Sequence, residues 1–301
     1  MAATPPVMVN TAEPPGFRAT LREIWRYRDL VLELSRRAVQ LRYKNSLLGV
    51  AWSLATPLMF VFMITMVRKL FLHQDIPNYS AFLFPTMFAW MFYTMAIPEA
   101  CTVLLEHAAM IRKVYFPREI LPMMVVVANL VHFLVALGVT IIYLLLLRIF
   151  PWQVNVELLL LLLIIPAQCL VVLGLGLMVS SLNVLFEDVR YIVQMLMQVM
   201  LYAVPIIYPI ESVAAAAQRD WGSPLLAALG PHLLDLYLLN PFASLLVLYQ
   251  KAMLPPIQGA PLPALPWSWG LLAQAWVVGL VILYLGARVF QRAKWTVVER
   301  L

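Results

Sequence analysis

Tyr and Gln side chains recur every three or four residues within one apolar stretch of the chain. Tyr191, Gln194, Gln198 and Tyr202, followed by Pro205, share one face of a helix at this spacing. Amide groups can hydrogen-bond to hydroxyls and aromatic rings can stack on sugar rings, so this face suits a polyol chain. Polar stripes also hydrogen-bond to neighbouring helices in membranes. The spacing alone leaves both interpretations open.

Groups that support catalysis are sparse. Outside the stripe, Asp75 lies alone and Glu187 adjoins Asp188, which gives no paired acid site of the kind that a membrane-embedded glycosyltransferase needs. No Gly-Lys pair and no phosphate-binding loop occur, so we expect no nucleotide site, catalytic residue or cofactor in this chain. We also predict no metal site, because the histidines are scattered, at His73, His107, His132 and His232.

The overall composition identifies the environment of these residues. Hydrophobic residues make up 63% of the 301 residues and charged residues only 12%. A water-soluble core of this length cannot hide so much apolar surface, so the sequence predicts an all-α integral membrane protein. A spanning helix needs roughly 20 apolar residues. We place six of them, at Leu47–Val67, Ala81–Leu104, Met123–Leu147, Leu158–Leu185, Tyr191–Ile210 and Trp267–Val289.

Lys and Arg are concentrated on one side of this predicted topology. They gather before the first span, between the second and third spans, and after the last span. Because cations near span ends stay in the cytoplasm, both termini are predicted to be cytoplasmic. The same asymmetry accounts for most of the net charge of +6, so the charge does not indicate a nucleic-acid partner. Residues 1–16 carry four prolines and no apolar core, which predicts a disordered tail rather than a signal peptide.

The segment from Phe17 to Lys44 has apolar residues at a nearly helical period, with arginines over much of the remaining surface. A basic helix with a Trp on its apolar side is typical of helices that lie along a membrane surface. We therefore predict an amphipathic interfacial helix over residues 17–46, before a six-span transmembrane domain over 47–301. A simple topological anchor would have the same composition.

The loop EHAAMIRKVYFPREILP, from Glu106 to Pro122, predicts a short helix over Glu106–Val114. Pro117 disfavours helix at the residue before it, and Pro122 is placed near the start of the next helix. A rigid surface helix between two spans is an element that a partner can push. Spacing alone favours an ordinary tight loop with cytoplasmic cations.

Four ordered stretches carry a family resemblance that covers nearly the whole chain. They are RYKNSLLGVAWSLATPLMF, MIRKVYFPREILP, NVLFEDVRYIV after a Gly-rich helix end, and LNPFASLLVLYQ. Together they resemble the permease subunit of ABC exporters for lipid-linked polysaccharides, a family that includes O-antigen, capsule, teichoic acid and galactan exporters. The chain departs from the family at Glu187, where a basic residue is expected before Asp188.

The resemblance implies partners as well as a fold. It implies a homodimer in the cytoplasmic (inner) membrane, with two separate ABC ATPase subunits that bind ATP and Mg. The short loop helix becomes the contact with the ATPase, through Glu106, His107, Met110, Arg112 and Lys113. The loop between the fifth and sixth spans becomes an outer gate; its apolar part, Leu233–Met253, is broken at Asn240 and Pro241 as in a re-entrant helix pair.

The resemblance also implies where a substrate passes. Arg42, Tyr43 and Lys44 would meet the pyrophosphate of the lipid carrier, although membrane anchoring explains the same charges. The channel would be lined by the Tyr and Gln stripe together with Trp52, Phe60, Trp90 and Tyr93. The expected function is the export of a polysaccharide that is linked to a lipid carrier, undecaprenyl pyrophosphate. A permease for a drug or a simple lipid stays as the alternative, with the glycosyltransferase less favoured.

Overall fold

The computed structural model describes Arg22 and residues 25–44, 51–72, 79–147, 156–217, 232–254 and 267–300. All regular secondary structure in these residues is helical, as the sequence predicts. The elements are α2 (Arg28–Tyr43), α3 (Ala51–Val67), the π-helical η1 (Arg68–Leu72), α4 (Tyr79–Glu106), α5 (Ala108–Lys113), α6 (Ile120–Leu146), α7 (Val156–Leu159), α8 (Leu161–Leu185), α9 (Val189–Ala203), α10 (Ile210–Ala217), α12 (Leu233–Leu238), α13 (Pro241–Met253) and α14 (Trp269–Arg300).

Five helices in the described residues are long and apolar enough to cross a membrane, judged by length and composition. They cover Leu54–Phe71, Tyr79–Glu106, Ile120–Leu146, Leu161–Leu185 and Trp269–Lys294. The predicted fifth span is represented by α9, an apolar helix of only 15 residues that ends before Pro205. That length is below the roughly 20 residues of a spanning helix, so the count of six spans stays a prediction.

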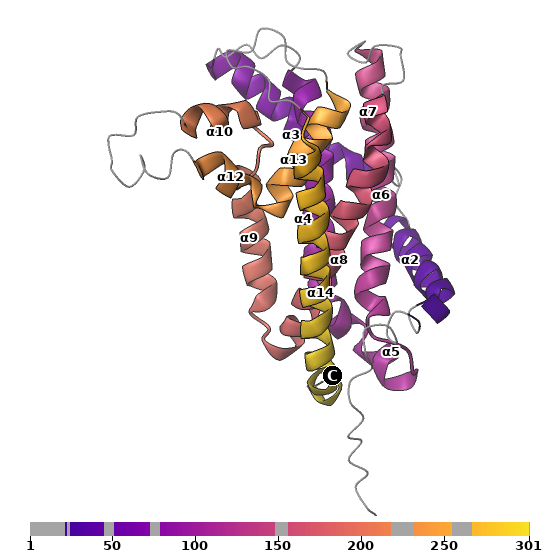
Figure 1. The fold of residues 1–301 in the computed structure, drawn as a ribbon. Coiled ribbons are helices and arrows are strands. Elements are labelled where there is room, and N and C mark those ends of the chain that lie inside the picture. The colour runs from indigo at the N-terminus through magenta and orange to yellow at the C-terminus, as the bar shows by residue number, and fades with distance from the viewer. Residues whose placement is uncertain are drawn as a thin grey trace, which may run out of the picture.

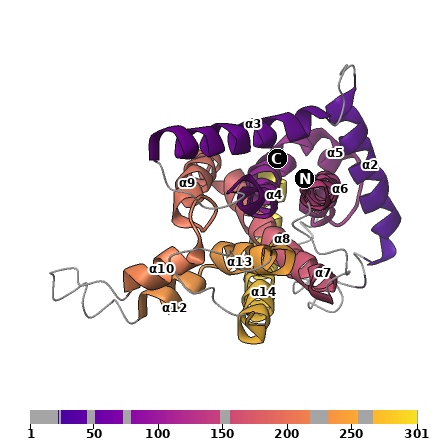
Figure 2. The same cartoon turned by 90° about the horizontal axis from the view of Figure 1, so that it is seen from above.

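The central element of the bundle is α4, which packs against α3, α6, α8, α9 and α13. Its sequence is apolar on all sides, as expected for a helix surrounded by other helices. In Figure 1, α4, α6, α8 and α14 stand nearly upright, with α2 leaning against one flank. Figure 2 shows α6 end-on but α3 along its length, so α3 is strongly inclined to the bundle.

The closest helix pair is α8 with α14, and glycines make it possible. A Cβ atom at Gly174 would lie 2.6 Å from the backbone nitrogen of Leu283, and Gly286 lies directly against the carbonyl of Gly174. Small residues let membrane helices approach backbone to backbone. The glycines of α8 and α14 therefore allow the two backbones to meet. The partner helix α14 continues to Arg300, beyond the predicted span end at Val289, and the part of it that is apolar enough to cross a membrane ends at Lys294.

The break predicted within Leu233–Met253 is present between α12 and α13. Asn240 has an extended backbone, and its side-chain oxygen accepts a hydrogen bond from the Phe242 amide at 3.0 Å, while Pro241 occupies the first turn of α13. This is a regular helix start. Most of α13 is then buried against α4, α8 and α14. Figure 1 places α10, α12 and α13 at the opposite end of the bundle from α5 and the C-terminus.

Candidate functional site

A polar cluster lies where α2 meets α4 and α6. The Arg42 guanidinium donates to the Glu99 carboxylate at 2.6 Å and to the side-chain oxygen of Asn129 at 3.0 Å. The Asn129 amide nitrogen donates to the same carboxylate oxygen at 2.7 Å. Each of the three side chains therefore contacts the other two. Charge-assisted hydrogen bonds of this kind are short and strong.

The charged cluster lies well inside the helix bundle and not at its end. Glu99 lies seven residues before the end of α4 at Glu106, which places it about 10 Å along the helix from that end. The Arg42 side chain is 26% exposed and the Glu99 side chain 33%, whereas Asn129 is buried. Ionised groups inside a membrane helix bundle are costly unless they are paired. The pair therefore holds the C-terminal end of α2 against the bundle.

A second contact extends the cluster along α2. The Tyr43 hydroxyl and the Nδ1 atom of His132 are 2.9 Å apart, and their rings meet edge to face. His132 is buried, and its Nε2 atom has no hydrogen-bond partner. Further towards the start of α2, Val31 and Ser35 are buried, and the Ser35 hydroxyl donates to the Met124 carbonyl of α6 at 3.1 Å. One side of α2 is thus bound to α6 along its length.

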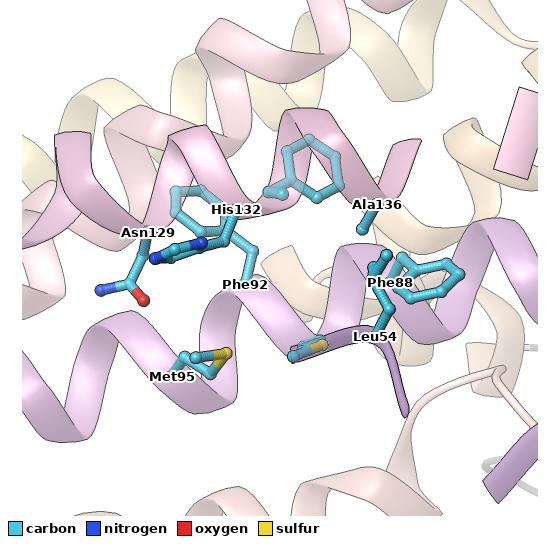
Figure 3. A pocket seen from close by; sticks show the side chains of 9 residues that line it. Leu54, Phe88, Phe92, Met95, Asn129, His132 and Ala136 are labelled. Carbon is cyan, nitrogen blue, oxygen red and sulfur yellow. The ribbon is translucent and has the colours of Figure 1, made fainter. Parts of the chain in front are cut away.

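A narrow apolar pocket adjoins the cluster between α3, α4 and α6. Its cavity volume is about 10 Å³, roughly the space that one water molecule needs, and it is lined by Leu54, Phe88, Met91, Phe92, Met95, Asn129, His132, Phe133 and Ala136. Figure 3 shows Asn129 and His132 together at one end of the pocket, with Phe88, Leu54 and Ala136 at the other. The pocket therefore has one polar end and one apolar end. The sequence predicts Asn129 and His132 only as an interhelical hydrogen-bonding pair.

The stripe on α9 faces away from the rest of the chain. Tyr191, Gln194, Gln198 and Tyr202 are all exposed, while Val193 and Met197 on the opposite face are buried. Tyr191 is covered in part by Arg190, whose guanidinium donates to the Tyr191 hydroxyl at 2.8 Å. The buried face packs α9 onto α4. The predicted common face is present, and it is not used for packing within this chain.

The structure separates the four other predicted lining residues. Trp52 is exposed and Phe60 is partly exposed, both on α3. Trp90 and Tyr93 lie instead in the interior of the bundle, where Phe242 packs edge-on against both rings. They fill the space between α4 and α13 and reach no open surface of the chain. The expectation that they line a channel is corrected here, because helix periodicity does not show which face of α4 the α13 helix covers.

The loop after α4 forms the short helix that the sequence predicts. Glu106 ends α4, His107 makes the turn, and α5 begins at Ala108 and ends at Lys113. Met110 packs towards the bundle, whereas Arg112 and Lys113 are exposed. The segment that follows bends around a hollow of about 330 Å³ bordered by Ile111, Arg112, Lys113, Val114, Tyr115, Phe116 and Arg118. Arginine and lysine side chains surround this hollow, and Tyr115 is 86% exposed.

The end of this loop is tied to the C-terminal helix. Lys294 of α14 pairs with the buried Glu119 carboxylate at 3.2 Å, and the Arg118 guanidinium donates to the Lys294 carbonyl at 3.0 Å. Burial lowers the pKa of Arg118, and the nearby Glu119 carboxylate opposes that shift. The two contacts join the α5–α6 loop to α14 at the end of the bundle where the C-terminus lies (Figure 1).

Sequence reasoning missed Glu99, Glu119 and Lys294. Glu99 is the lone charged residue within the predicted span Ala81–Leu104, and that isolation was the available signal. The partner of Glu99 is Arg42, which lies 57 residues away along the chain. Sequence spacing therefore does not indicate that the two side chains form a pair. Nothing in the spacing of Glu119 and Lys294 indicates their contact, because it depends on how α14 packs.

Comparisons with known proteins show which family the chain resembles. The O-antigen export system permease protein RfbA of Myxococcus xanthus is 27% identical over 76% of this chain and 82% of its own length. Two proteins of that name from Klebsiella pneumoniae are 30% identical over 60% of this chain and 69% of their own, and 23% identical over 90% and 94%, respectively. The family model for ABC-2 type transporters matches residues 29–229. The chain therefore belongs to the ABC-2 type transporter family.

Proposed function

We propose that this chain is the permease subunit of an ATP-driven exporter that moves a lipid-linked polysaccharide across the cytoplasmic membrane. The three relatives that carry the name O-antigen export system permease support this choice of substrate class over a drug or a simple lipid. Undecaprenyl pyrophosphate is the lipid carrier that the proposal assumes. ATP and Mg bind on the partner ATPase.

The observation that carries the proposal is the exposed stripe on α9. Two amides and two phenol rings face outward from an apolar helix that uses its other face for packing. Polar side chains that face lipid are costly, so the stripe needs either water, a polar substrate or a second subunit beside it. A polyol chain supplies hydroxyls for the amides of Gln194 and Gln198, and sugar faces for the rings of Tyr191 and Tyr202.

Two copies of the chain enclose the path in this proposal. Each contributes α9, with Trp52 and Phe60 of α3 as the remaining lining residues. The segment from α9 through Ile210 then crosses the membrane with the help of the second copy, which completes six spans over 47–301. α12 and α13 form the re-entrant outer gate. The proposed interfacial helix over residues 17–46 contains α2, and the predicted tail, residues 1–16, lies outside the described residues.

The ATPase subunits dock on the short helix α5. Arg112 and Lys113 are its exposed cations, Glu106 is an acidic counterpart beside them, and His107 and Met110 fix the helix to the end of α4. Closure of the ATPases on ATP pushes α5, and the long helices follow as rigid elements. This places α5 and both termini in the cytoplasm.

Substrate reaches the path beside α2. Arg42, Tyr43 and Lys44 lie at the end of α2, just before the chain enters α3. Arginine binds phosphate oxygens in a planar, bidentate manner. The pyrophosphate of the carrier therefore meets these residues first, and the first sugars meet Trp52.

A deletion in the host organism tests the proposal. Loss of this chain is expected to remove one surface polysaccharide and to cause its lipid-linked form to accumulate on the cytoplasmic side of the membrane. A plasmid copy of the wild-type chain is expected to restore export. A deletion strain with normal surface polysaccharides and no accumulated glycolipid would contradict the proposed function.

A further inference from the structure

The polar cluster around Arg42 has a feature that neither membrane anchoring nor helix packing requires. The guanidinium is bound by a carboxylate that comes from inside the bundle, on α4, and is itself oriented by Asn129. The nearest anion to Arg42 is therefore part of the protein. Any external anion has to compete with Glu99 for the same donor groups.

From this arrangement we infer that Glu99 is an internal substitute for the phosphate group of a lipid, and that a lipid phosphate displaces it from Arg42 when it binds. The inference rests on the proposed function, because it names the residue that regulates its phosphate-binding arginine. Glu99 acts here as a positioning residue through Arg42. It does not itself touch the phosphate.

The exchange keeps Arg42 paired with an anion and leaves Glu99, whose side chain is 33% exposed, with Asn129 as its hydrogen-bond donor. A carboxylate and a phosphate oxygen accept the same pair of N–H donors from a guanidinium. Replacing one anion by the other leaves Arg42 neutralised throughout, so no uncompensated charge is created on the arginine inside the membrane region. Arg42 keeps 26% of its side chain exposed, so an incoming lipid headgroup can reach it.

The surroundings offer the displaced Glu99 carboxylate a partner. Asn129 can keep its bond to Glu99 at 2.7 Å when Arg42 turns away, which holds the freed carboxylate in place. On the other side, the Nε2 atom of His132 is buried without a partner, and His132 and Asn129 form the polar end of the neighbouring pocket (Figure 3).

The exchange also links lipid binding to the position of α2. The Arg42–Glu99 pair and the Tyr43–His132 contact hold the end of α2 on α4 and α6. When a phosphate takes Arg42, one of these two contacts is lost. A lipid with a phosphate headgroup is thereby able to release the end of α2, whereas an uncharged lipid is not.

The test measures how lipid concentration stimulates ATP hydrolysis by the purified complex of this chain with its ATPase in phosphatidylcholine nanodiscs. The probes are undecaprenyl pyrophosphate and, separately, phosphatidylglycerol. Glu99→Gln keeps the shape of the side chain but removes its charge, so Arg42 is free in a larger fraction of molecules. We expect the half-saturating concentration to fall by about tenfold, since apparent affinity scales with the competent fraction.

Three variants separate this inference from a structural role. Glu187→Gln removes an exposed carboxylate between α8 and α9 and is expected to leave the half-saturating concentration unchanged. Arg42→Gln is expected to abolish the stimulation. Arg42→Gln combined with Glu99→Gln is expected to behave like Arg42→Gln alone, because Glu99 acts only through Arg42.

The outcomes distinguish the two claims. A tenfold fall with undecaprenyl pyrophosphate alone supports the exchange and assigns it to the substrate carrier, whereas a fall with both probes supports it for lipid phosphate in general. A wild-type complex that responds while Glu99→Gln leaves the response unchanged or weaker overturns this inference but not the proposed function. A wild-type complex that responds to neither probe contradicts both.

Discussion

At the residue scale, the contact between Glu119 and Lys294 shows how a buried charge depends on its partner. Glu119 is almost fully buried, and Lys294 is the cation that neutralises it at 3.2 Å. A single substitution that removes the cation leaves the carboxylate unpaired in a poorly solvated place. Leaving the Glu119 carboxylate unpaired costs more free energy than the ion pair contributes to stability, because the buried carboxylate has lost its contacts with water.

The substitution Lys294→Met is therefore expected to lower the free energy of unfolding by about 2 kcal/mol or more. Thermal unfolding of the purified chain would show this as a lower melting temperature. Arg292→Met, an exposed position on the same helix, is the matched control and should leave the melting temperature unchanged. Adding Glu119→Gln to Lys294→Met should recover part of the loss; no recovery would mean that the unpaired charge is not its cause.

The second prediction at this scale concerns the two amides on α9. The double substitution Gln194→Leu and Gln198→Leu keeps α9 apolar and helical but removes hydrogen bonds to a polyol. With about 0.6 kcal/mol for each bond in a membrane, export should fall roughly threefold for each residue. Transport of labelled glycolipid in proteoliposomes measures this. Met195→Leu on the same exposed surface is the control, and unchanged export by the double variant would remove the two amides from the path.

At the scale of elements, the glycines of α8 determine how closely α14 approaches. Gly174 lies against the backbone of α14, with no space for a methyl group, whereas a methyl group added at Gly138 on α6 would have no atom within 4 Å. Gly174→Ala is expected to destabilise the chain by about 1–3 kcal/mol, while Gly138→Ala should not. Thermal unfolding of the two variants side by side checks this. Equal stability would show that α8 and α14 can separate without cost.

The elements also show what the sequence predicts well. Apolar length located the long helices, and Pro117 and Asn240–Pro241 located the ends of α5 and α12 correctly, because these signals are local. Which face of α4 is covered by α13 is a long-range property, so the sequence did not show that Trp90 and Tyr93 pack against Phe242 of α13. The Arg42–Glu99 pair was not anticipated for the same reason.

The short helix α5 carries a prediction of its own. Reversing both exposed cations, Arg112→Glu and Lys113→Glu, should leave the chain folded and in the membrane but prevent co-purification of the ATPase. Because α5 buries none of its residues, the substitutions have little reason to disturb the bundle. The control is Lys69→Glu. Lys69 lies in η1, which comes before α4, whereas α5 comes after α4. Normal co-purification of the ATPase with the double reversal would place its docking surface elsewhere.

At the scale of the whole molecule, the two ends of the bundle differ in character. One end holds α5, the salt bridge between Glu119 and Lys294, and the C-terminus, and it is rich in exposed cations. The other end holds the broken helix pair α12 and α13 (Figure 1). Between them, α2 is fastened by Arg42 and Glu99, and α9 leaves its polar stripe open. In the proposed exporter, the ATPase acts on the first end, the gate lies at the second end, and the polar face of α9 meets the substrate.

The measurement that tests this account most directly is ATP hydrolysis in lipid nanodiscs, by the chain alone and by the chain co-purified with its ABC ATPase. Both samples are assayed with and without undecaprenyl-pyrophosphate-linked glycan. The account predicts no hydrolysis by the chain alone, and hydrolysis by the complex that increases when the glycolipid is added. Failure of any ATPase to associate, or a chemical change of the glycolipid by the chain alone, would contradict the central claim that this chain is the permease of an ATP-driven exporter.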